Sequence, residues 1–146
     1  MRTELIALAL IACGSSPSSA PEPAPVRVAD KAAPLASKEF FRVDVPAQPA
    51  CTAGTACEAR LVVTALGDYH VNDEYPFKLV ADATPGVAVD GTGTFTPEGK
   101  TGTLAIVFRA DKPGNAKIAG TFKLSVCNAQ NCQIESPKIA FDVAIR

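Results

Sequence analysis

Cysteine is the residue type whose spacing in this sequence most directly indicates chemistry. Four of the five cysteines form two local pairs, Cys51 with Cys57 and Cys127 with Cys132, and the fifth, Cys13, lies near the N-terminus. In an exported protein an even set of cysteines indicates disulfides, although four cysteines allow three connectivities. Both intervening segments are small or polar, so each pair can close locally. The alternative is a four-thiolate zinc site, but five residues separate Cys51 from Cys57, a wider spacing than structural zinc pairs usually have.

Cys127 and Cys132 lie between two regular strand patterns, which places them on the loop of a terminal hairpin at one end of the fold. A bridge across so short a loop stabilises by only about 2 kcal/mol in the chain-entropy model. Short exposed loops can also strain a bridge and make it easier to reduce. The pair is therefore a candidate redox couple as well as a candidate structural bridge, and spacing alone favours the structural bridge because most exported disulfides are structural. Cys51 and Cys57 are interpreted as a structural disulfide.

The first thirteen residues have the features of an export signal. After Arg2, residues 5–12 are all apolar, a run of eight that is far shorter than the roughly 20 residues needed to span a membrane. Such a run fits the apolar region of a signal peptide. The junction Leu-Ile-Ala-Cys, which ends at Cys13, resembles the lipobox of bacterial lipoproteins. The resemblance implies that residues 1–12 are removed and that Cys13 becomes the acylated N-terminus.

This resemblance also implies a cellular location. Two or three acyl chains hold a protein at a membrane almost permanently, because each buried CH₂ contributes about 0.8 kcal/mol. In many Gram-negative lipoproteins, a residue other than Asp after the lipidated cysteine implies sorting to the outer membrane, and Gly14 occupies that position here. We therefore expect a lipid-anchored protein of the cell envelope, at the outer membrane and facing the periplasm.

The sequence predicts a flexible linker at 13–37, followed by one folded domain at 38–146. From Gly14 to Ser37 there are five prolines, many Ala and Ser residues and no aromatic residue, so this segment cannot bury a core. Its 24 residues reach roughly 75 Å as extended polyproline. All nine aromatic residues follow Ser37. Acidic and basic residues are nearly balanced, 15 against 14, with no basic run, so nucleic-acid binding is not expected.

The domain shows the period-two alternation that is typical of half-buried strands. Ile139, Phe141 and Val143 share one face of the last strand, and Ile118 and Phe122 share one face of an earlier strand, so we expect these side chains in the core. Turn sequences separate the alternating runs, and no run has a helical period. The predicted fold is all-β: an immunoglobulin-like, two-sheet antiparallel sandwich of about seven strands. Strands are expected at 40–45, 59–66, 77–82, 87–95, 103–109, 117–126 and 138–145.

The segment from Gly120 to Glu135 contains Cys127 and Cys132 after a strand and before a final amphipathic strand. In this it resembles the N-terminal immunoglobulin-like periplasmic domain of the thiol:disulfide interchange protein family. The resemblance implies that the two cysteines form a redox pair. Such a pair takes electrons from a membrane-embedded partner, here a separate protein, and passes them to periplasmic thiol oxidoreductases.

The stretch at 67–72 is similar to an aromatic and His-containing stretch of the same family domains. The resemblance implies that Tyr69, His70 and Tyr75 border the redox pair, with His70 able to assist proton transfer. The alternative for His70 is a hydrogen-bonded surface residue after a turn. The alternative for Tyr75 is packing next to the following strand.

Two classes of function follow. The first is a membrane-anchored thiol–disulfide electron-transfer domain of oxidoreductase type that uses Cys127 and Cys132. The second is a non-enzymatic binding or envelope-structural lipoprotein with purely structural disulfides. A copper carrier is disfavoured, because the chain has one His and a single Met that leaves with the signal. No cofactor or metal is expected; the expected partners are the membrane, through Cys13, and periplasmic thiol oxidoreductases or another envelope protein.

Overall fold

A computed structural model describes residues 32–146 of the chain. The predicted signal peptide at 1–12, the predicted lipidation site Cys13 and most of the predicted linker lie outside the described residues. Regular secondary structure within 32–146 consists of β-strands alone, and this part of the chain contains no helix that could cross a membrane.

Ten strands form the domain. Seven of them match the seven alternating segments of the sequence, and the other three, β1, β4 and β9, are additional. Their bounds are β1 (Ala36–Lys38), β2 (Phe41–Asp44), β3 (Cys57–Ala65), β4 (His70–Val71), β5 (Lys78–Ala81), β6 (Val87–Glu98), β7 (Thr101–Ala110), β8 (Gly114–Cys127), β9 (Cys132–Glu135) and β10 (Lys138–Ile145).

The first sheet has the strand order β1-β2-β3-β7-β6, and every neighbouring pair in it is antiparallel. β3 and β7 are long central strands whose leucines face each other, Leu61 opposite Leu104. β6 is an edge strand whose register shifts between Asp90 and Thr94. Gly91 lies in that bulge with a φ of 68°, a conformation that glycine adopts without the steric penalty of a side chain.

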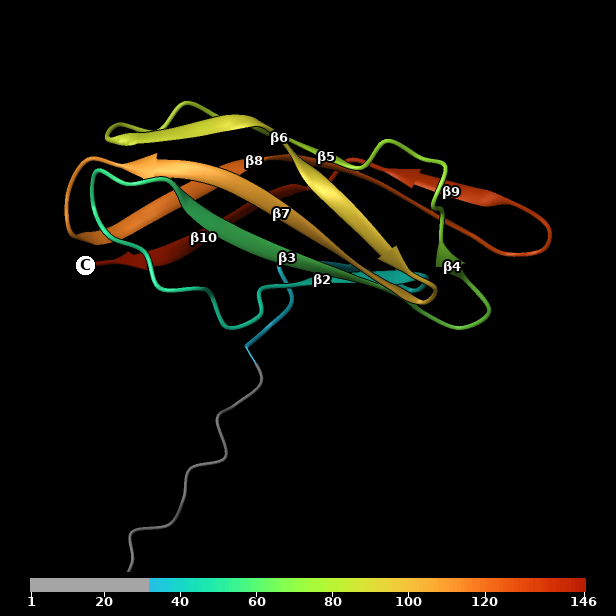
Figure 1. Cartoon of the computed structure of the whole chain (residues 1–146). Helices are drawn as coiled ribbons and strands as arrows, with labels where there is room; N and C mark the ends of the chain where they lie inside the picture. The colour runs from blue at the N-terminus through green and yellow to red at the C-terminus, as the bar shows by residue number, and fades with distance from the viewer. Residues whose placement is uncertain (1–31) are drawn as a thin grey trace, which may run out of the picture. The chain divides into compact units, whose positions relative to one another are not determined.

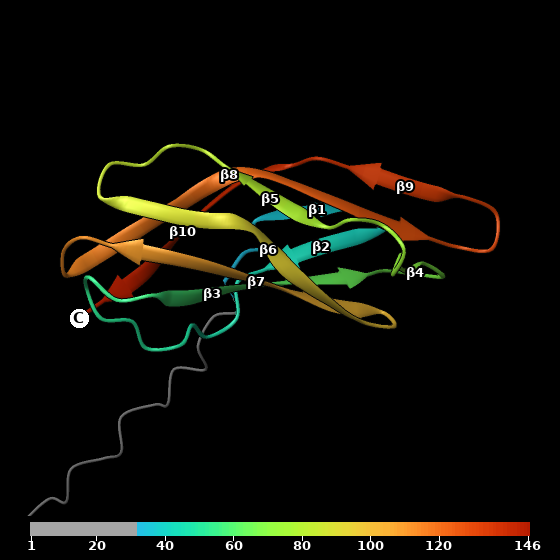
Figure 2. The ribbon, with the colours of Figure 1, turned by 45° about the horizontal axis from the view of Figure 1, so that its top comes forward.

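β8 is the centre of the second sheet, and each of its edges pairs with two shorter strands. Along one edge, β10 pairs with residues 114–121 of β8 and β9 pairs with 124–127. Along the other edge, β5 pairs with 120–123 and β4 with 126–127. Figures 1 and 2 show β4 and β9 at one end of the domain and the C-terminus at the other, so β8 runs nearly the whole length of the domain.

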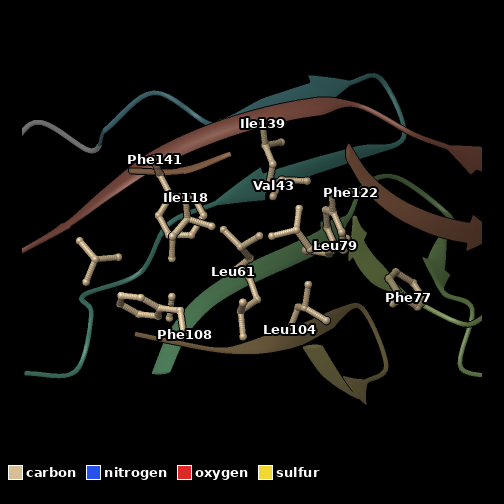
Figure 3. Packing of buried hydrophobic residues seen from close by; sticks show 14 of the residues in the cluster. Val43, Leu61, Phe77, Leu79, Leu104, Phe108, Ile118, Phe122, Ile139 and Phe141 are labelled. Carbon is tan, nitrogen blue, oxygen red and sulfur yellow. The ribbon is translucent and has the colours of Figure 1, made fainter. Parts of the chain in front are cut away.

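The core lies between the two sheets, where alternate side chains of both sheets meet (Figure 3). Burial of this apolar surface is the main favourable term in folding. The five side chains predicted for the core are all buried, with exposed fractions of 7% or less: Ile118, Phe122, Ile139, Phe141 and Val143.

The structure confirms the all-β, two-sheet antiparallel sandwich, which is the architecture of immunoglobulin-like domains. The three additional strands have only two to four residues each, too few for an alternation to be visible in the sequence. They form because a longer strand offers each of them an edge: β1 pairs with β2, while β4 and β9 pair with β8. β1 also brings Ala36 and Ser37 into the sheet, so the first strand begins two residues before Lys38, the expected start of the folded domain.

Candidate functional site

Both local cysteine pairs form disulfides, Cys51 with Cys57 and Cys127 with Cys132. The two bridges lie at opposite ends of β8. Cys51 pairs with Ile145 beside the first residue of β8, whereas Cys127 is its last residue. Four thiolates at opposite ends of a domain cannot bind one ion, so the zinc alternative is wrong. Among residues 32–146, no three His, Cys, Asp or Glu side chains are grouped closely enough to hold a metal ion.

Cys127 and Cys132 face each other at the base of a tight hairpin between β8 and β9. Their Cα atoms are 4.0 Å apart, the close approach of a non-hydrogen-bonded antiparallel pair. One position further, the amide of Asn128 donates to the carbonyl of Asn131 at 2.9 Å and closes the turn. The side-chain oxygen of Asn128 also accepts from the amide of Gln130 at 3.0 Å. We expected the cysteines on the loop itself; they instead end one strand and begin the next, which holds both side chains on one face of the sheet.

The two cysteines of this hairpin differ in exposure. Cys127 is only 6% exposed, whereas Cys132 is exposed. Cys127 lies two positions after Ser125 on β8, so its side chain projects from the same outer face of the strand as that of Ser125. It is nevertheless buried, because β4 and β9 flank it on both sides. Cys132 lies on β9, which pairs with β8 alone among the described strands, so solvent reaches it from the open edge.

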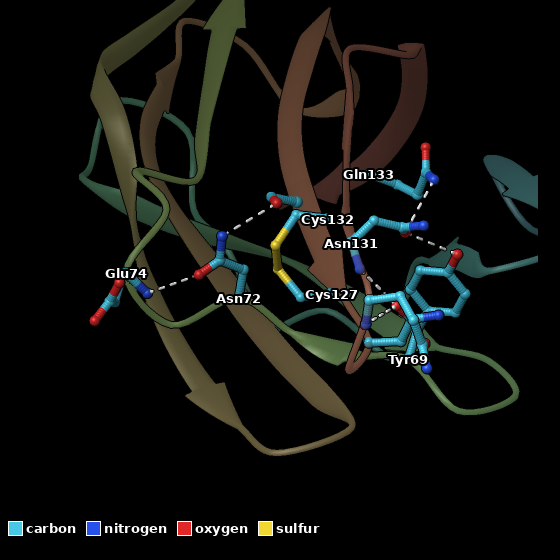
Figure 4. The surroundings of a disulfide bond; sticks show 10 residues. Tyr69, Asn72, Glu74, Cys127, Asn131, Cys132 and Gln133 are labelled. Carbon is cyan, nitrogen blue, oxygen red and sulfur yellow. Dashed lines mark hydrogen bonds between the residues drawn. A yellow bond between two sulfur atoms is a disulfide. The ribbon is translucent and has the colours of Figure 1, made fainter.

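Two of the three side chains expected at the border of the pair lie beside this hairpin. His70 on β4 pairs directly with Cys127, so His70, Cys127 and Cys132 form one row across three strands. Residues that face each other across an antiparallel pair project from the same face. The hydroxyl of Tyr69 donates to Oδ1 of Asn131 at 3.4 Å (Figure 4). An exposed imidazole therefore occupies the position next to the buried cysteine.

Tyr75 packs next to the following strand, which was the alternative interpretation of this residue. Its ring meets that of Phe77 edge to face, with the ring centroids 5.6 Å apart. Its amide donates to the carbonyl of Asn72 at 3.2 Å. Of the three expected border residues, Tyr69 and His70 are the ones that the fold brings to the hairpin.

A hydrogen-bonded pair, half-buried Asn72 and buried Ser125, holds the chain after β4 against β8. Ser125 is fully buried, and its hydroxyl accepts from Nδ2 of Asn72 at 3.2 Å (Figure 4). The amide of Asn72 donates to the carbonyl of Ser125 at 3.1 Å, and its Oδ1 accepts from the amide of Glu74 at 3.2 Å. Sequence reasoning missed this pair, because its members are 53 positions apart and neither has a local signal. It also missed Asn128 and Asn131, although Asn at both ends of a short polar segment is typical of a turn.

The Cys51–Cys57 bridge is enclosed. The two residues are 3% and 7% exposed. Cys51 lies in irregular chain that is joined to the chain end after the last strand. There the amide of Arg146 donates to the carbonyl of Cys51 and the amide of Ala53 donates to the carbonyl of Arg146, both at 2.9 Å. Cys57 begins β3 opposite Phe108 of β7. This enclosure fits the structural role expected for the pair.

No family model matches the chain. No curated protein matches it either. A solved structure with a related backbone is the crystal structure of the GAE domain of yeast GGA1, which is 14% identical in sequence; the superposition covers 75% of this chain and 96% of that chain with a TM-score of 0.43. A likeness this distant does not bear on activity, so the function is argued from the geometry of the site itself.

Proposed function

We propose that this domain exchanges thiols and disulfides, with Cys132 as the sulfur that reacts with a partner protein and Cys127 as the second sulfur of the pair. The observation that supports the proposal is their unequal exposure, with Cys127 6% exposed and Cys132 open to solvent. Exchange requires one accessible sulfur and a second sulfur within reach of it. The other bridge offers no accessible sulfur, because Cys51 and Cys57 are both buried.

Reduction of the domain takes two displacements. The thiolate of a partner dithiol attacks Sγ of Cys132, so a bond forms between the partner and Cys132 while the Cys127–Cys132 bond breaks and Cys127 leaves as a thiolate. The second thiolate of the partner then attacks the partner's own sulfur in this mixed disulfide and releases Cys132. The partner ends as a disulfide, and the domain gains two electrons and, once both thiolates are protonated, two protons. The reverse sequence passes the electrons to a second, oxidised partner.

We assign to His70 the role of proton donor to the thiolate of Cys127. The Cys127 thiolate is enclosed when it leaves and therefore lacks hydration. Protonation of this thiolate favours its displacement from Cys132. His70 lies directly across from Cys127 on β4 and is itself exposed. An imidazole in that position can donate a proton to the leaving sulfur and recover one from solvent.

The hairpin does not depend on the disulfide for its closure. The backbone hydrogen bond between Asn128 and Asn131 closes the turn, and β9 pairs with β8 over all four of its residues. The dithiol form can therefore keep the same backbone, which a couple that cycles between two redox states requires. This independence also supports the exchange function over a purely structural bridge.

A redox titration tests the exchange function. The purified protein is equilibrated in thiol/disulfide buffers of stepped potential, free thiols are alkylated, and the modified cysteines are mapped by mass. We expect Cys127–Cys132 to be reduced at a milder potential than Cys51–Cys57, because structural bridges typically lie below about −300 mV. Equal resistance of the two bridges would leave the alternative, a non-enzymatic binding or envelope-structural lipoprotein with two structural disulfides.

We also propose that the domain works at the cell envelope, on a lipid anchor at Cys13, with periplasmic thiol oxidoreductases as its partners. The Leu-Ile-Ala-Cys junction and the proline-rich segment after it support this location. Cys13→Ser should release the protein from the membrane fraction or leave the precursor uncut. Normal acylation of that variant would overturn the anchor, and would leave the exchange chemistry at the other end of the chain unaffected.

A further inference from the structure

Ile134 is the large hydrophobic side chain that is most open to solvent among residues 32–146. It is 64% exposed, compared with 46% for Val80 and 41% for Val107. Ile134 follows Cys132 by two positions on β9, so the two side chains project from the same face, about 7 Å apart along the strand. The accessible cysteine and the most exposed apolar side chain therefore share one surface.

The outer edge of β9 pairs with no other strand among residues 32–146. β1 reaches β9 through the ion pair of Lys38 with Glu135, at 2.7 Å. Hydrogen-bonded and non-hydrogen-bonded positions alternate along an antiparallel pair. Asn128 and Asn131 form a hydrogen-bonded position, so Cys132 and, two positions later, Ile134 occupy non-hydrogen-bonded positions. Their amide and carbonyl groups consequently point away from β8. An extended segment of another chain can pair with these groups as an added strand.

The direction of attack places an incoming protein over this edge. In a displacement at sulfur, the incoming sulfur approaches the attacked sulfur from the side opposite to the leaving sulfur. Cys127 is the leaving group and lies on β8, so the approach to Cys132 runs across the open edge of β9. The chain that carries the incoming thiolate must then lie against β9, which carries the exposed side chain of Ile134.

Building on the proposed exchange function, we infer that Ile134 and the open edge of β9 form the docking surface for a protein dithiol whose reactive cysteine is surrounded by apolar surface. Ile134 acts as a specificity-determining residue and takes no part in the electron transfer itself. A small thiol needs no such contact, because it reaches Cys132 without covering its neighbour. Protein and small-molecule reductants should therefore differ in their dependence on this side chain.

Three variants of the full chain test this inference. Ile134→Thr keeps a branched β-carbon and adds no charge, Ile134→Leu restores an apolar side chain, and Val107→Thr makes the matched change on the outer face of the other sheet. Reduction of Cys127–Cys132 is followed with reduced thioredoxin as the protein dithiol and with dithiothreitol as the small thiol. For Ile134→Thr we expect the thioredoxin rate to fall about fivefold or more and the dithiothreitol rate to stay unchanged. Ile134→Leu and Val107→Thr should match the wild type with both reductants.

The two reductants separate the docking surface from the exchange function. An undiminished thioredoxin rate for Ile134→Thr would overturn the docking surface while dithiothreitol still reported a reducible pair. An equal loss with both reductants would also overturn it, because the substitution would then have changed the disulfide itself. Resistance of the wild-type pair to both reductants would overturn the exchange function and, with it, this inference.

Discussion

The two disulfides are nearly equal as covalent cross-links and very unequal in their surroundings. Their cysteines are 6 and 5 positions apart, so each closes a loop whose entropy contributes about 2 kcal/mol to stability. Cys51 and Cys57 are both buried, Cys51 in irregular chain beside the C-terminal strand and Cys57 as the first residue of β3. Cys127 and Cys132 face each other across a regular hairpin, one buried and one open to solvent.

This difference shows that spacing does not set the surroundings of a disulfide. At Cys51–Cys57 the covalent bond joins the isolated bridge residue Cys51 to the first residue of β3, and residues 52–56 between them belong to no strand. At Cys127–Cys132 a hydrogen-bonded turn and a strand pair already hold the chain, and the bond is left accessible on one side. The first arrangement favours a permanent bridge, and the second permits the bond to open while the backbone stays in place.

Both disulfide-bearing ends of the domain depend on one shared core. A substitution in this core should have the largest effect on the free energy of unfolding. Phe141 is 7% exposed, whereas Asp142, its neighbour on β10, projects to solvent. Phe141→Ala should lower the free energy of unfolding by about 3–5 kcal/mol, and Asp142→Ala should change it by less than about 0.5 kcal/mol. Urea unfolding of the oxidised protein measures both. Equal losses would show that the register of β10 is wrong.

Removal of each disulfide in turn measures how much each one contributes to stability. The double replacement Cys51→Ser with Cys57→Ser leaves two hydroxyls in buried positions, whereas Cys127→Ser with Cys132→Ser leaves one. A buried hydroxyl without a partner costs about 1–3 kcal/mol. We therefore expect the first double variant to lose at least about 1 kcal/mol more stability than the second in urea unfolding. A larger loss at the hairpin would contradict the assignment of Cys51–Cys57 as the structural bridge.

Single replacements separate the two sulfurs of the hairpin. In Cys127→Ser the remaining Cys132 thiolate is accessible, so it attacks glutathione disulfide, releases glutathione and retains one glutathione as a mixed disulfide. In Cys132→Ser the remaining Cys127 is buried, and the same adduct should form about tenfold more slowly or less. Mass spectrometry follows both reactions. Equal rates of adduct formation would contradict the proposal that exposure makes Cys132 the sulfur that reacts with a partner.

The smallest expected effect concerns His70. His70→Gln removes the proton donor beside Cys127 and keeps a polar, exposed side chain on β4. Reduction of Cys127–Cys132 by dithiothreitol at neutral pH should slow several-fold, because the leaving thiolate then waits for a proton from water. Reduction of Cys51–Cys57 in denaturant serves as the control and should not change. An unaltered rate of reduction at Cys127–Cys132 would show that His70 takes no part in the proton transfer.

Much of the fold could be predicted because its signals are local. The alternation at 138–145 and 117–126 identified two strands and the face of each that is buried, and Ile118, Phe122 and Phe141 are in the core. The short strands β4 and β9 could not be predicted, because two to four residues show no period and their pairing depends on the edges of β8.

Sequence alone determined the local events: which segments alternate as strands, where turns separate them, and which cysteines lie close enough to pair with each other. The sequence also placed Cys127 and Cys132 together in a terminal hairpin, although it indicated that they lie on its loop. The burial of Cys127 between β4 and β9, the exposure of Cys132 and the place of His70 in the same row depend on tertiary contacts and could not be derived from the sequence. The physical reason is that exposure and cross-strand neighbours depend on which distant segments pair, and pairing between distant segments is set by the whole sandwich rather than by any local pattern.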